Sequence, residues 1–302
     1  MSAGKRGPVA HAAGAAAPPA AVASRQAPSD LTLGFVDEAT VRSTAAAAAD
    51  PDWLLVDRLA GLTAFGTLPI ETNQLYTTYV DLRNAHLAAA RPYTGAAIIA
   101  PGATDAKLLP EGAAAYAEIR ENRVAALVIS AEARAAGVVL ETLAELSTRD
   151  PELMRRLLEG GCALPENDKL AQMTRALWSD GLALHVPDGA RLEHPIVLRW
   201  VVGAPDTALL ARTIISVGDD AEVSVVEEQM SAGAPDPSSA EGQAFFAGTT
   251  EVQIGAGSTL AFAGLQDLSL RQVAFQHRSA VLGRGATVRW ALAQLGCRVV
   301  RS

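Results

Sequence analysis

The chain has 302 residues, of which 49% are hydrophobic and 19% charged, so it can bury a substantial core in one or two domains. The net charge of −8 and a pI near 5.2 argue against a basic surface for nucleic acid, and no apolar run is long enough to span a membrane. Two cysteines, Cys162 and Cys297, are too few for a disulfide framework and form no close-spaced metal motif. We therefore expect a soluble protein of a reducing, cytoplasmic compartment.

Residues 1–30 are predicted to be a disordered tail. Met1–Ser29 contain no acidic residue and are dominated by Ala, Pro and Gly, a composition that buries too little apolar area to fold. An organelle transit peptide is the alternative, since such segments are poor in acidic residues and contain Ser and Arg. Only Lys5, Arg6 and Arg25 are basic in this long stretch, which favours the tail.

Residues 31–165 are predicted to form a mixed domain with several helices. One or two helices are expected before Leu68, because apolar residues recur at helical spacing in Trp53, Leu54, Leu59, Leu62 and Phe65. The runs AAIIAP and ALVIS predict short strands, and the sequence DPE at 150–152 predicts the start of a later helix. The acidic residues of this region are interpreted as a solvated helix face rather than as catalytic groups: Glu141, Glu145, Glu152 and Glu159.

Residues 166–302 are predicted to form a strand-rich second domain that is entered through a short helix. From Asp168 to Trp178 the apolar residues recur every three or four positions, which indicates one buried helical face. The tripeptide SDG at 179–181 predicts a turn that ends this helix. LALHV then predicts a strand, and PDG at 187–189 predicts a second turn.

A loose repeat follows in PDGARLEHPI, GDDAEVSVVEE, GAGSTLAFAG and GRGATVRWAL, each with a Gly/Asp turn, a small residue and an alternating strand. The small residues, at steps of 31, 37 and 28, are Ala190, Ala221, Ser258 and Ala286. Because side chains alternate in direction along a strand, six equivalent apolar residues would face one side: Val223 and Val225, Leu260 and Phe262, and Val288 and Trp290. Stacked on successive coils, they would form the interior of a parallel β-solenoid.

Two enzyme classes with solenoid folds fit these units poorly. Left-handed hexapeptide acyltransferases repeat an aliphatic residue every six positions, whereas these units are several times longer. A polysaccharide-degrading enzyme would need two carboxylates placed across a sugar bond. The position of Glu227 is taken by Gly264 and Leu292 in the following units, so no stacked pair of carboxylates is expected.

The segment DKLAQMTRALWSDGLALHVPDGARLEHPIVLRW, at 168–200, resembles the entry to the core of the SufB/SufD proteins of iron–sulfur cluster assembly. The residues that match are Asp168, Lys169, Ala171, Ala176, Leu177, Trp178, Ser179, Gly181, Val186, Pro187, Gly189, Glu193, Pro195 and Ile196. Met173, Thr174 and His185 depart from the usual pattern. Earlier, PDWLLVDRLAGLTAFGTLP and LYTTYVDLR are similar to the start of SufD-like proteins, the latter through Tyr79, Val80, Asp81 and Leu82.

The resemblance implies an α+β, mainly β fold, in which an N-terminal helical and mixed domain precedes a right-handed parallel β-helix, the SufBD core. Measured against that family, the chain covers the N-terminal domain and about the first half of the β-helix. It ends in GCRVVRS, an alternating apolar stretch without a turn or cap. We therefore expect a chain truncated at its C-terminus, or one completed by a partner.

The resemblance also implies a function, that of a SufD-like subunit of the SufBCD scaffold rather than an enzyme. The expected partners are a SufB-like paralogue, bound through the β-helix, and a SufC-like ATPase. The chain alone would bind no cofactor stably, and a nascent iron–sulfur cluster would lie at the interface with the SufB-like partner. A SufB-like paralogue and a structural β-solenoid without a metal role are the alternatives.

No residue is assigned a catalytic, cofactor or metal role from the sequence, but two residues of the strand-rich region are candidates for ligands. His277 could bind a metal, although an isolated histidine is more often a hydrogen-bonded structural residue. Cys297 could be a soft ligand for iron, although without close partners it is more simply a small buried hydrophobe. The role of Cys162 is left open.

Overall fold

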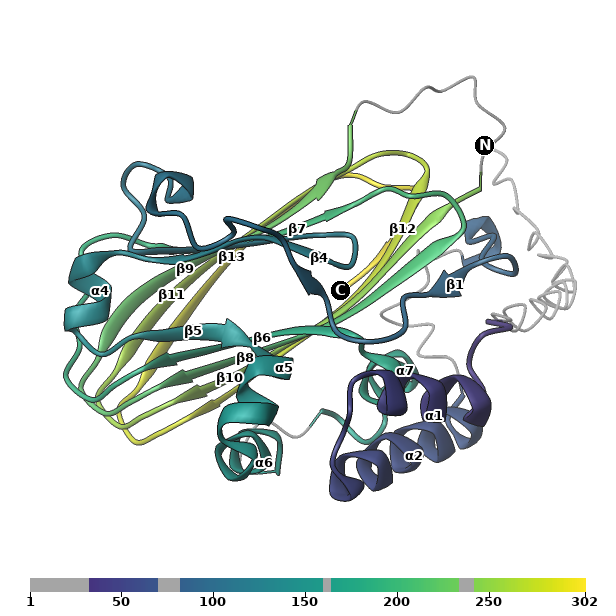
Figure 1. Cartoon of the computed structure of the whole chain (residues 1–302), viewed down its shortest axis with the longest axis horizontal. Helices are drawn as coiled ribbons and strands as arrows, with labels where there is room; N and C mark the ends of the chain where they lie inside the picture. Colours follow the sequence, from purple (N-terminus) through teal and green to yellow (C-terminus); the bar gives the residue numbers. More distant parts are fainter. Residues whose placement is uncertain (1–32, 70–81, 160–163, 234–241) are drawn as a thin grey trace, which may run out of the picture.

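The computed structural model describes residues 33–69, 82–159, 164–233 and 242–302 (Figure 1). The predicted tail at 1–30, the Tyr79–Asp81 match and Cys162 lie outside the described residues. The described fold is mixed α/β and rich in strands, with two mostly parallel seven-stranded sheets. This agrees with the expected strand-rich class, and the domain boundary after residue 165 stays a prediction.

The first sheet, called sheet A, has the strand order β14-β12-β10-β8-β6-β5, with β1 paired to β8. Its strands are β1 (Arg91–Pro92), β5 (Val139–Thr142), β6 (Asp180–Val186), β8 (Thr207–Val217), β10 (Ala244–Ile254), β12 (Gln272–Leu282) and β14 (Val299–Arg301). All pairs in this sheet are parallel except β5 with β6.

The second sheet, called sheet B, has the order β13-β11-β9-β7-β3-β4-β2. Its strands are β2 (Ile98–Ile99), β3 (Ala115–Arg120), β4 (Arg123–Ile129), β7 (Ile196–Val202), β9 (Glu222–Ser231), β11 (Thr259–Leu268) and β13 (Thr287–Gly296). Only β3 and β4 are antiparallel here. From β6 onward the chain alternates between the two sheets, so each strand from β8 to β14 pairs with the strand two places before it.

The stacking predicted from the repeat is confirmed by the register of sheet B. Val223 pairs with Leu260 and Leu260 with Val288, while Phe262 lies between Val225 and Trp290. The rings of Phe262 and Trp290 lie 4.7 Å apart between centroids. All six side chains belong to, or pack against, the main core between the two sheets. Glu227, Gly264 and Leu292 also align as predicted.

The corners that precede these strands explain why a small residue recurs there. The residue before each small one has a positive φ: Gly189 at 68°, Asp220 at 53°, Gly257 at 70° and Gly285 at 73°. Backbone in this left-handed region suits Gly and, less often, Asp. Successive corners are also joined, because the Asp188 carboxylate accepts from Asp219 N at 2.8 Å and the Asp219 carboxylate accepts from Ala256 N at 2.6 Å.

Helices cover the outer face of sheet A. They are α1 (Glu38–Ala47), α2 (Asp52–Thr67), α5 (Leu143–Arg149), α6 (Pro151–Glu159) and α7 (Lys169–Leu177). The short helix α4 (Ala131–Ala135) lies elsewhere, and its Ala133 belongs to the core between the sheets. Of the two 3₁₀ turns, η1 (Leu82–Asn84) and η2 (Ala106–Leu108), the second contacts β4 of sheet B. Helix α7 packs on β8, β10 and β12, α5 on β6 and α6 on β8, while α2 lies outside α7 (Figure 1). No helix in the described ranges is long and apolar enough to cross a membrane.

Local sequence explains how several of these helices begin. Asp168 caps α7 by accepting hydrogen bonds from Leu170 N and Ala171 N, each at 3.0 Å. Thr142 and Glu145 form a reciprocal capping box on α5. Glu145 therefore serves as a cap, and Glu141 lies on strand β5 rather than on the predicted helix face.

The turn predicted at SDG, residues 179–181, is wrong. Helix α7 ends at Leu177, and strand β6 already begins at Asp180, which pairs with Ala211. Turn propensity is a local preference, and here parallel pairing with β8 overrides it.

Gly181 gives a testable consequence of this close packing. A Cβ atom there would lie 2.3 Å from Leu143 Cδ1 and 2.7 Å from the Arg212 carbonyl oxygen. We expect Gly181→Ala to lower the free energy of unfolding by about 1–3 kcal/mol, because overpacking forces neighbouring groups to shift. Urea denaturation measures this, with Gly66→Ala on α2 as control, since no atom lies within 4 Å of a Cβ there. Equal stability of the two variants would contradict the packing argument.

Candidate functional site

His277 lies on the outer face of sheet A, where it meets the start of helix α7. Its Nδ1 atom is 3.3 Å from the Asp168 carboxylate, which also accepts from Arg301 at 2.6 Å. Burial opposes ionisation of Asp168, but hydrogen bonds from His277 and Arg301 outweigh it, so the pKa of this carboxyl lies well below its usual range. The predicted ligand candidate is thus part of a polar contact that holds α7 against β12 and β14.

Cys297, the second candidate, lies between β13 and β14 and packs against the core between the sheets. Its thiol donates to the carbonyl oxygens of Gln272 at 2.9 Å and Val299 at 3.3 Å. Burial raises the pKa of this thiol to about 11. At neutral pH the sulfur is therefore protonated, whereas both metal binding and nucleophilic attack use the thiolate.

The structure does not bring His277 and Cys297 together. Cys297 contacts Gln272 at the start of β12, and His277 lies five residues further along that strand, about 17 Å away at the rise of a β-strand. The imidazole also faces the helices, on the opposite side of sheet A from the thiol. Within the described ranges, no three His, Cys, Asp or Glu side chains gather as a metal site would require.

A polar layer between the two sheets is the candidate site that the sequence reasoning missed. Its members occupy inward positions on β9, β10, β11 and β12: Glu227, Gln229, Thr250, Gln266, Gln276 and Arg278. Glu227 lies at its centre, accepting from Arg278 Nη2 at 2.7 Å, from Thr250 Oγ1 at 3.1 Å and from Gln229 Nε2 at 3.4 Å. The alternation that placed Val223 and Val225 inward also places Glu227 and Gln229 inward, so the signal was available in the sequence.

Glutamine side chains extend this polar layer across the interior. Gln276 Nε2 donates to Gln229 Oε1 and, at 3.1 Å, to Gln266 Oε1. Three buried atoms of the layer have no hydrogen-bond partner in the described part of the chain: Gln266 Nε2, Gln276 Oε1 and Arg278 Nε. Buried polar atoms normally have hydrogen-bond partners. The polar layer can therefore still donate hydrogen bonds from the two nitrogens and accept them at the oxygen.

Asp180, at the start of β6, is a second buried carboxyl on the inward side. Leu182, Leu184 and Val186 alternate with it toward the main core. Its Oδ2 accepts from Ser179 Oγ at 3.0 Å, while its Oδ1 has no partner among the described residues. Burial raises the pKa of Asp180 to about 7. The side chain can therefore hold or release a proton near neutral pH.

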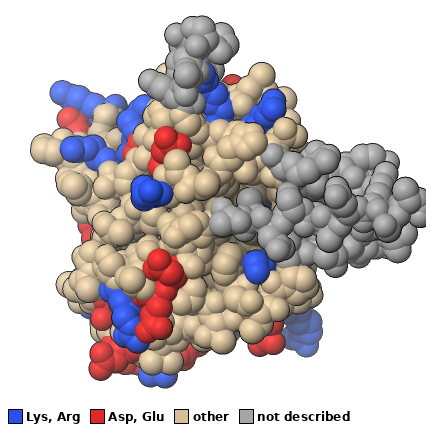
Figure 2. Space-filling model, turned by 90° about the vertical axis from the view of Figure 1, so that its right-hand side faces the viewer, with Lys and Arg blue, Asp and Glu red and all other residues tan. Residues whose placement is uncertain are grey.

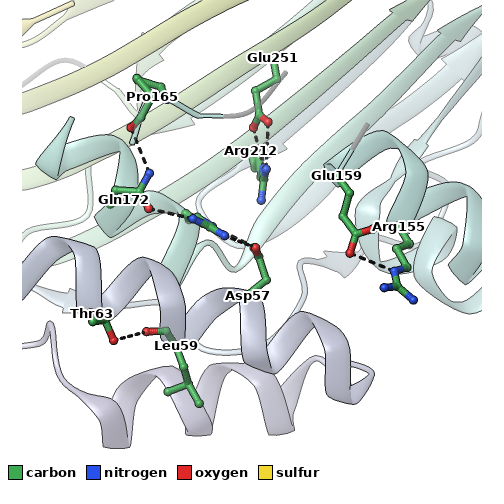
Figure 3. Close-up of polar contacts among 10 residues, drawn as sticks. Asp57, Leu59, Thr63, Arg155, Glu159, Pro165, Gln172, Arg212 and Glu251 are labelled. Atoms are coloured by element: carbon green, nitrogen blue, oxygen red, sulfur yellow. Dashed lines mark hydrogen bonds and ion pairs between the residues drawn. The ribbon is translucent and has the colours of Figure 1, made fainter. Parts of the chain in front are cut away.

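Ion pairs on the outer side of sheet A join neighbouring strands or neighbouring helices rather than form a site. Arg212 and Glu251 make a bidentate pair between β8 and β10, with distances of 2.6 and 2.9 Å (Figure 3). Arg175 on α7 joins Asp57 on α2 and donates to Gln172 at 3.1 Å. The first pair links two strands of sheet A and the second links two helices, and each charge has its counter-charge.

An open groove lies on the surface of the described part of the chain. The groove, of about 340 Å³, is lined mainly by β4, β5 and α5 and contains the Glu141–Arg149 ion pair but neither His nor Cys. On the face shown in Figure 2, basic and acidic side chains are interspersed with uncharged ones. That face therefore presents no continuous basic surface of the kind that nucleic acids require.

Two family models match the chain along most of its described length. The SUF system FeS cluster assembly, SufBD core domain model matches residues 200–302, and the SufBD protein N-terminal region model matches residues 122–198. The first match contains every residue of the polar layer, together with His277 and Cys297.

Curated relatives agree with these matches. Iron-sulfur cluster assembly SufBD family proteins of Mycobacterium bovis (strain ATCC BAA-935 / AF2122/97) and of Mycobacterium tuberculosis strains CDC 1551 / Oshkosh and ATCC 25618 / H37Rv are each 24% identical over 214 residues, or 66% of this chain. The chain spans about a quarter of the length of these relatives, 25% in each case. From the two family models and these relatives, we conclude that the chain belongs to the SufB/SufD family of iron–sulfur cluster assembly proteins.

Proposed function

We propose that this chain acts as a SufD-like subunit of a cytoplasmic SufBCD scaffold, on which a nascent iron–sulfur cluster is the cargo. The chain would not be an enzyme. It would supply a rigid strand-rich surface to a SufB-like paralogue, and a SufC-like ATPase would complete the assembly. The observation that carries the proposal is the match of both SufBD regions, in order, to residues 122–302 with one residue between them.

We also propose that the two sheets are the two faces of a parallel β-helix. Strands from β6 to β14 alternate strictly between the sheets, pair in parallel, and turn at corners that stack on one another. Such a coil is stiff, because each strand from β6 to β12 is hydrogen-bonded on both sides by neighbours in register. Rigidity suits a scaffold that must hold partners in a fixed geometry.

The state of Cys297 favours a SufD-like role over a SufB-like one. A subunit that carried sulfur or iron on this residue would need an accessible thiolate. Here the thiol is buried, hydrogen-bonded to two carbonyl oxygens and protonated at neutral pH. Ligands for the cargo would therefore come mainly from the SufB-like partner at their shared interface.

Co-expression with SufB-like and SufC-like proteins of the same organism tests this function. We expect a three-component complex in size exclusion and cluster absorption after anaerobic reconstitution. Cys297→Ser should leave both unchanged, because the hydroxyl can replace the thiol as donor to the Gln272 and Val299 carbonyls.

Three results would contradict parts of the proposal. An intact complex that loses its absorption in the Cys297→Ser variant would make Cys297 a ligand and favour the SufB-like alternative. A complex that forms but never holds an iron–sulfur cluster would show that the chain has no role in cluster assembly. If the chain binds neither protein, the structural β-solenoid becomes the better description.

A further inference from the structure

The amides of the polar layer form a chain of hydrogen bonds whose direction is set at one end. The Glu227 carboxylate, which can only accept, accepts from Gln229 Nε2 at 3.4 Å and from Arg278 Nη2 at 2.7 Å. Gln229 Oε1 therefore points away from the carboxylate, and it accepts from Gln276 Nε2. The same nitrogen gives its second hydrogen to Gln266 Oε1 at 3.1 Å. Each amide is thus held in one orientation by the group before it.

This order leaves one acceptor and one donor without a partner among the described residues, Gln276 Oε1 and Gln266 Nε2. Turning the amides over does not pair them. A reversed Gln276 would face its oxygen toward the oxygens of Gln229 and Gln266, and a reversed Gln266 would face its nitrogen toward the Gln276 nitrogen. Reversing Gln229 as well would face its oxygen toward the Glu227 carboxylate. The two unpaired atoms therefore follow from the composition of the layer.

The two unpaired atoms lie close together and deep inside the chain. They belong to amides joined by one hydrogen bond of 3.1 Å, and the oxygen and nitrogen of an amide are about 2.3 Å apart by standard bond lengths. The distance between them is therefore at most about 8 Å. Gln276 is 3% exposed and Gln266 is 2% exposed. Buried polar atoms without hydrogen bonds are costly, so a ligand that supplies both bonds would stabilise the layer.

The chemistry of the two atoms decides the class of ligand. The ligand must accept a hydrogen bond from Gln266 Nε2 and donate one to Gln276 Oε1. A metal cation cannot accept from an amide nitrogen, and an anion without hydrogens cannot donate to an amide oxygen. Water does both, it is the smallest such molecule, and buried water in proteins typically makes about three hydrogen bonds.

We propose that the polar layer is a binding site for ordered water, which joins Gln266 Nε2 to Gln276 Oε1. One water molecule bridges atoms up to about 6 Å apart, and two in series cover the rest of the allowed distance. Arg278 Nε, the third unpaired atom of the layer among the described residues, offers a further donor. The proposal stands apart from the scaffold role, because the chain would hold this water without a SufB-like or SufC-like protein.

Oxygen-17 relaxation dispersion of the purified chain tests the proposal, because it counts water molecules that stay bound for longer than the chain takes to tumble. We expect Gln266→Met to hold at least one such water fewer than the wild type, since methionine keeps the length of the side chain and removes the donor. Gln294→Met is the matched control. Gln294 aligns with Gln266 on the next strand of sheet B, but it is exposed and donates to Ser302 at 2.8 Å, so the count should not change.

A second measurement needs no variant. Nuclear Overhauser effects between water and side-chain amide protons report which amides contact a bound water molecule. In the wild type we expect such an effect at the Gln266 Nε2 protons, with the sign that belongs to a slowly exchanging, bound water.

Either of two results would overturn the proposal. Equal water counts in the wild type and in folded Gln266→Met would place every long-lived water elsewhere in the chain. The lack of an Overhauser effect from bound water at the Gln266 Nε2 protons would show that water is not the partner of this donor, and this result stands even where Gln266→Met does not fold.

Discussion

Replacing Arg58 with alanine is expected to lower the free energy of unfolding by about 3–5 kcal/mol, the usual cost of breaking a buried ion pair from one side. Arg58 Nε donates to Asp50 at 2.6 Å, and the two side chains are 0% and 4% exposed. Its Nη1 donates to the Trp178 carbonyl oxygen at 2.8 Å, and its guanidinium lies 4.3 Å from the centre of the Trp178 ring. The substitution would leave the Asp50 carboxylate buried without a counter-charge.

Urea denaturation measures this loss, with the slope of unfolding free energy against urea concentration compared between variant and wild type. Arg42→Ala is the control, because the Arg42–Glu38 pair is exposed and should contribute at most about 0.5 kcal/mol. Arg58→Met with Asp50→Leu should recover much of the stability, since it removes both charges together. If Arg58→Ala costs no more than the control, the buried pair does not fix α2 against the end of α7.

The second large effect concerns the dependence of stability on pH. Burial holds the pKa of Asp180 near 7 in the folded chain, whereas an unfolded aspartate has its ordinary pKa near 3.8. Between these values the folded state keeps a proton that the unfolded state has lost. This contribution to stability is complete below the unfolded pKa and disappears as pH rises through the folded pKa.

Asp180→Asn cannot ionise and should therefore remove this dependence. We expect the variant to gain about 3 kcal/mol of unfolding free energy relative to wild type between pH 5 and pH 8.5. Denaturation curves at the two pH values measure the difference, and Glu111→Gln, at an exposed carboxylate, should show none of it. Parallel pH profiles for Asp180→Asn and wild type would show that Asp180 is ionised in the folded state.

Strand alternation allowed the stacked interior of sheet B to be predicted from sequence. The period of two depends only on backbone geometry, so Leu260 and Phe262 could be placed inward without any coordinates. The same rule applied to polar residues would have found Glu227 and Gln229. Neither residue was predicted to lie inside, because interior positions were expected to carry apolar residues alone.

Other features depend on distant parts of the chain and could not be predicted. His277 and Arg301 meet at Asp168, more than a hundred residues earlier in the sequence, and no local pattern specifies that contact. Gly181 looked like a turn residue because its local propensity favours turns. Its strand conformation follows from pairing with β8, which a single sequence does not show.

The contacts of the Asp168 carboxylate also affect how this fold unfolds. A stack of coils in which each touches only its neighbours can fray one coil at a time from its end. Helix α7 prevents such independent fraying here, because it packs across β8, β10 and β12 and binds β14 through Arg301. The last strand of sheet A cannot open without breaking a charge-assisted contact to a helix that also holds β8 and β10. Cooperativity therefore extends over these strands as one unit, and their slowest hydrogen exchange would be a property of the unit rather than of any single strand.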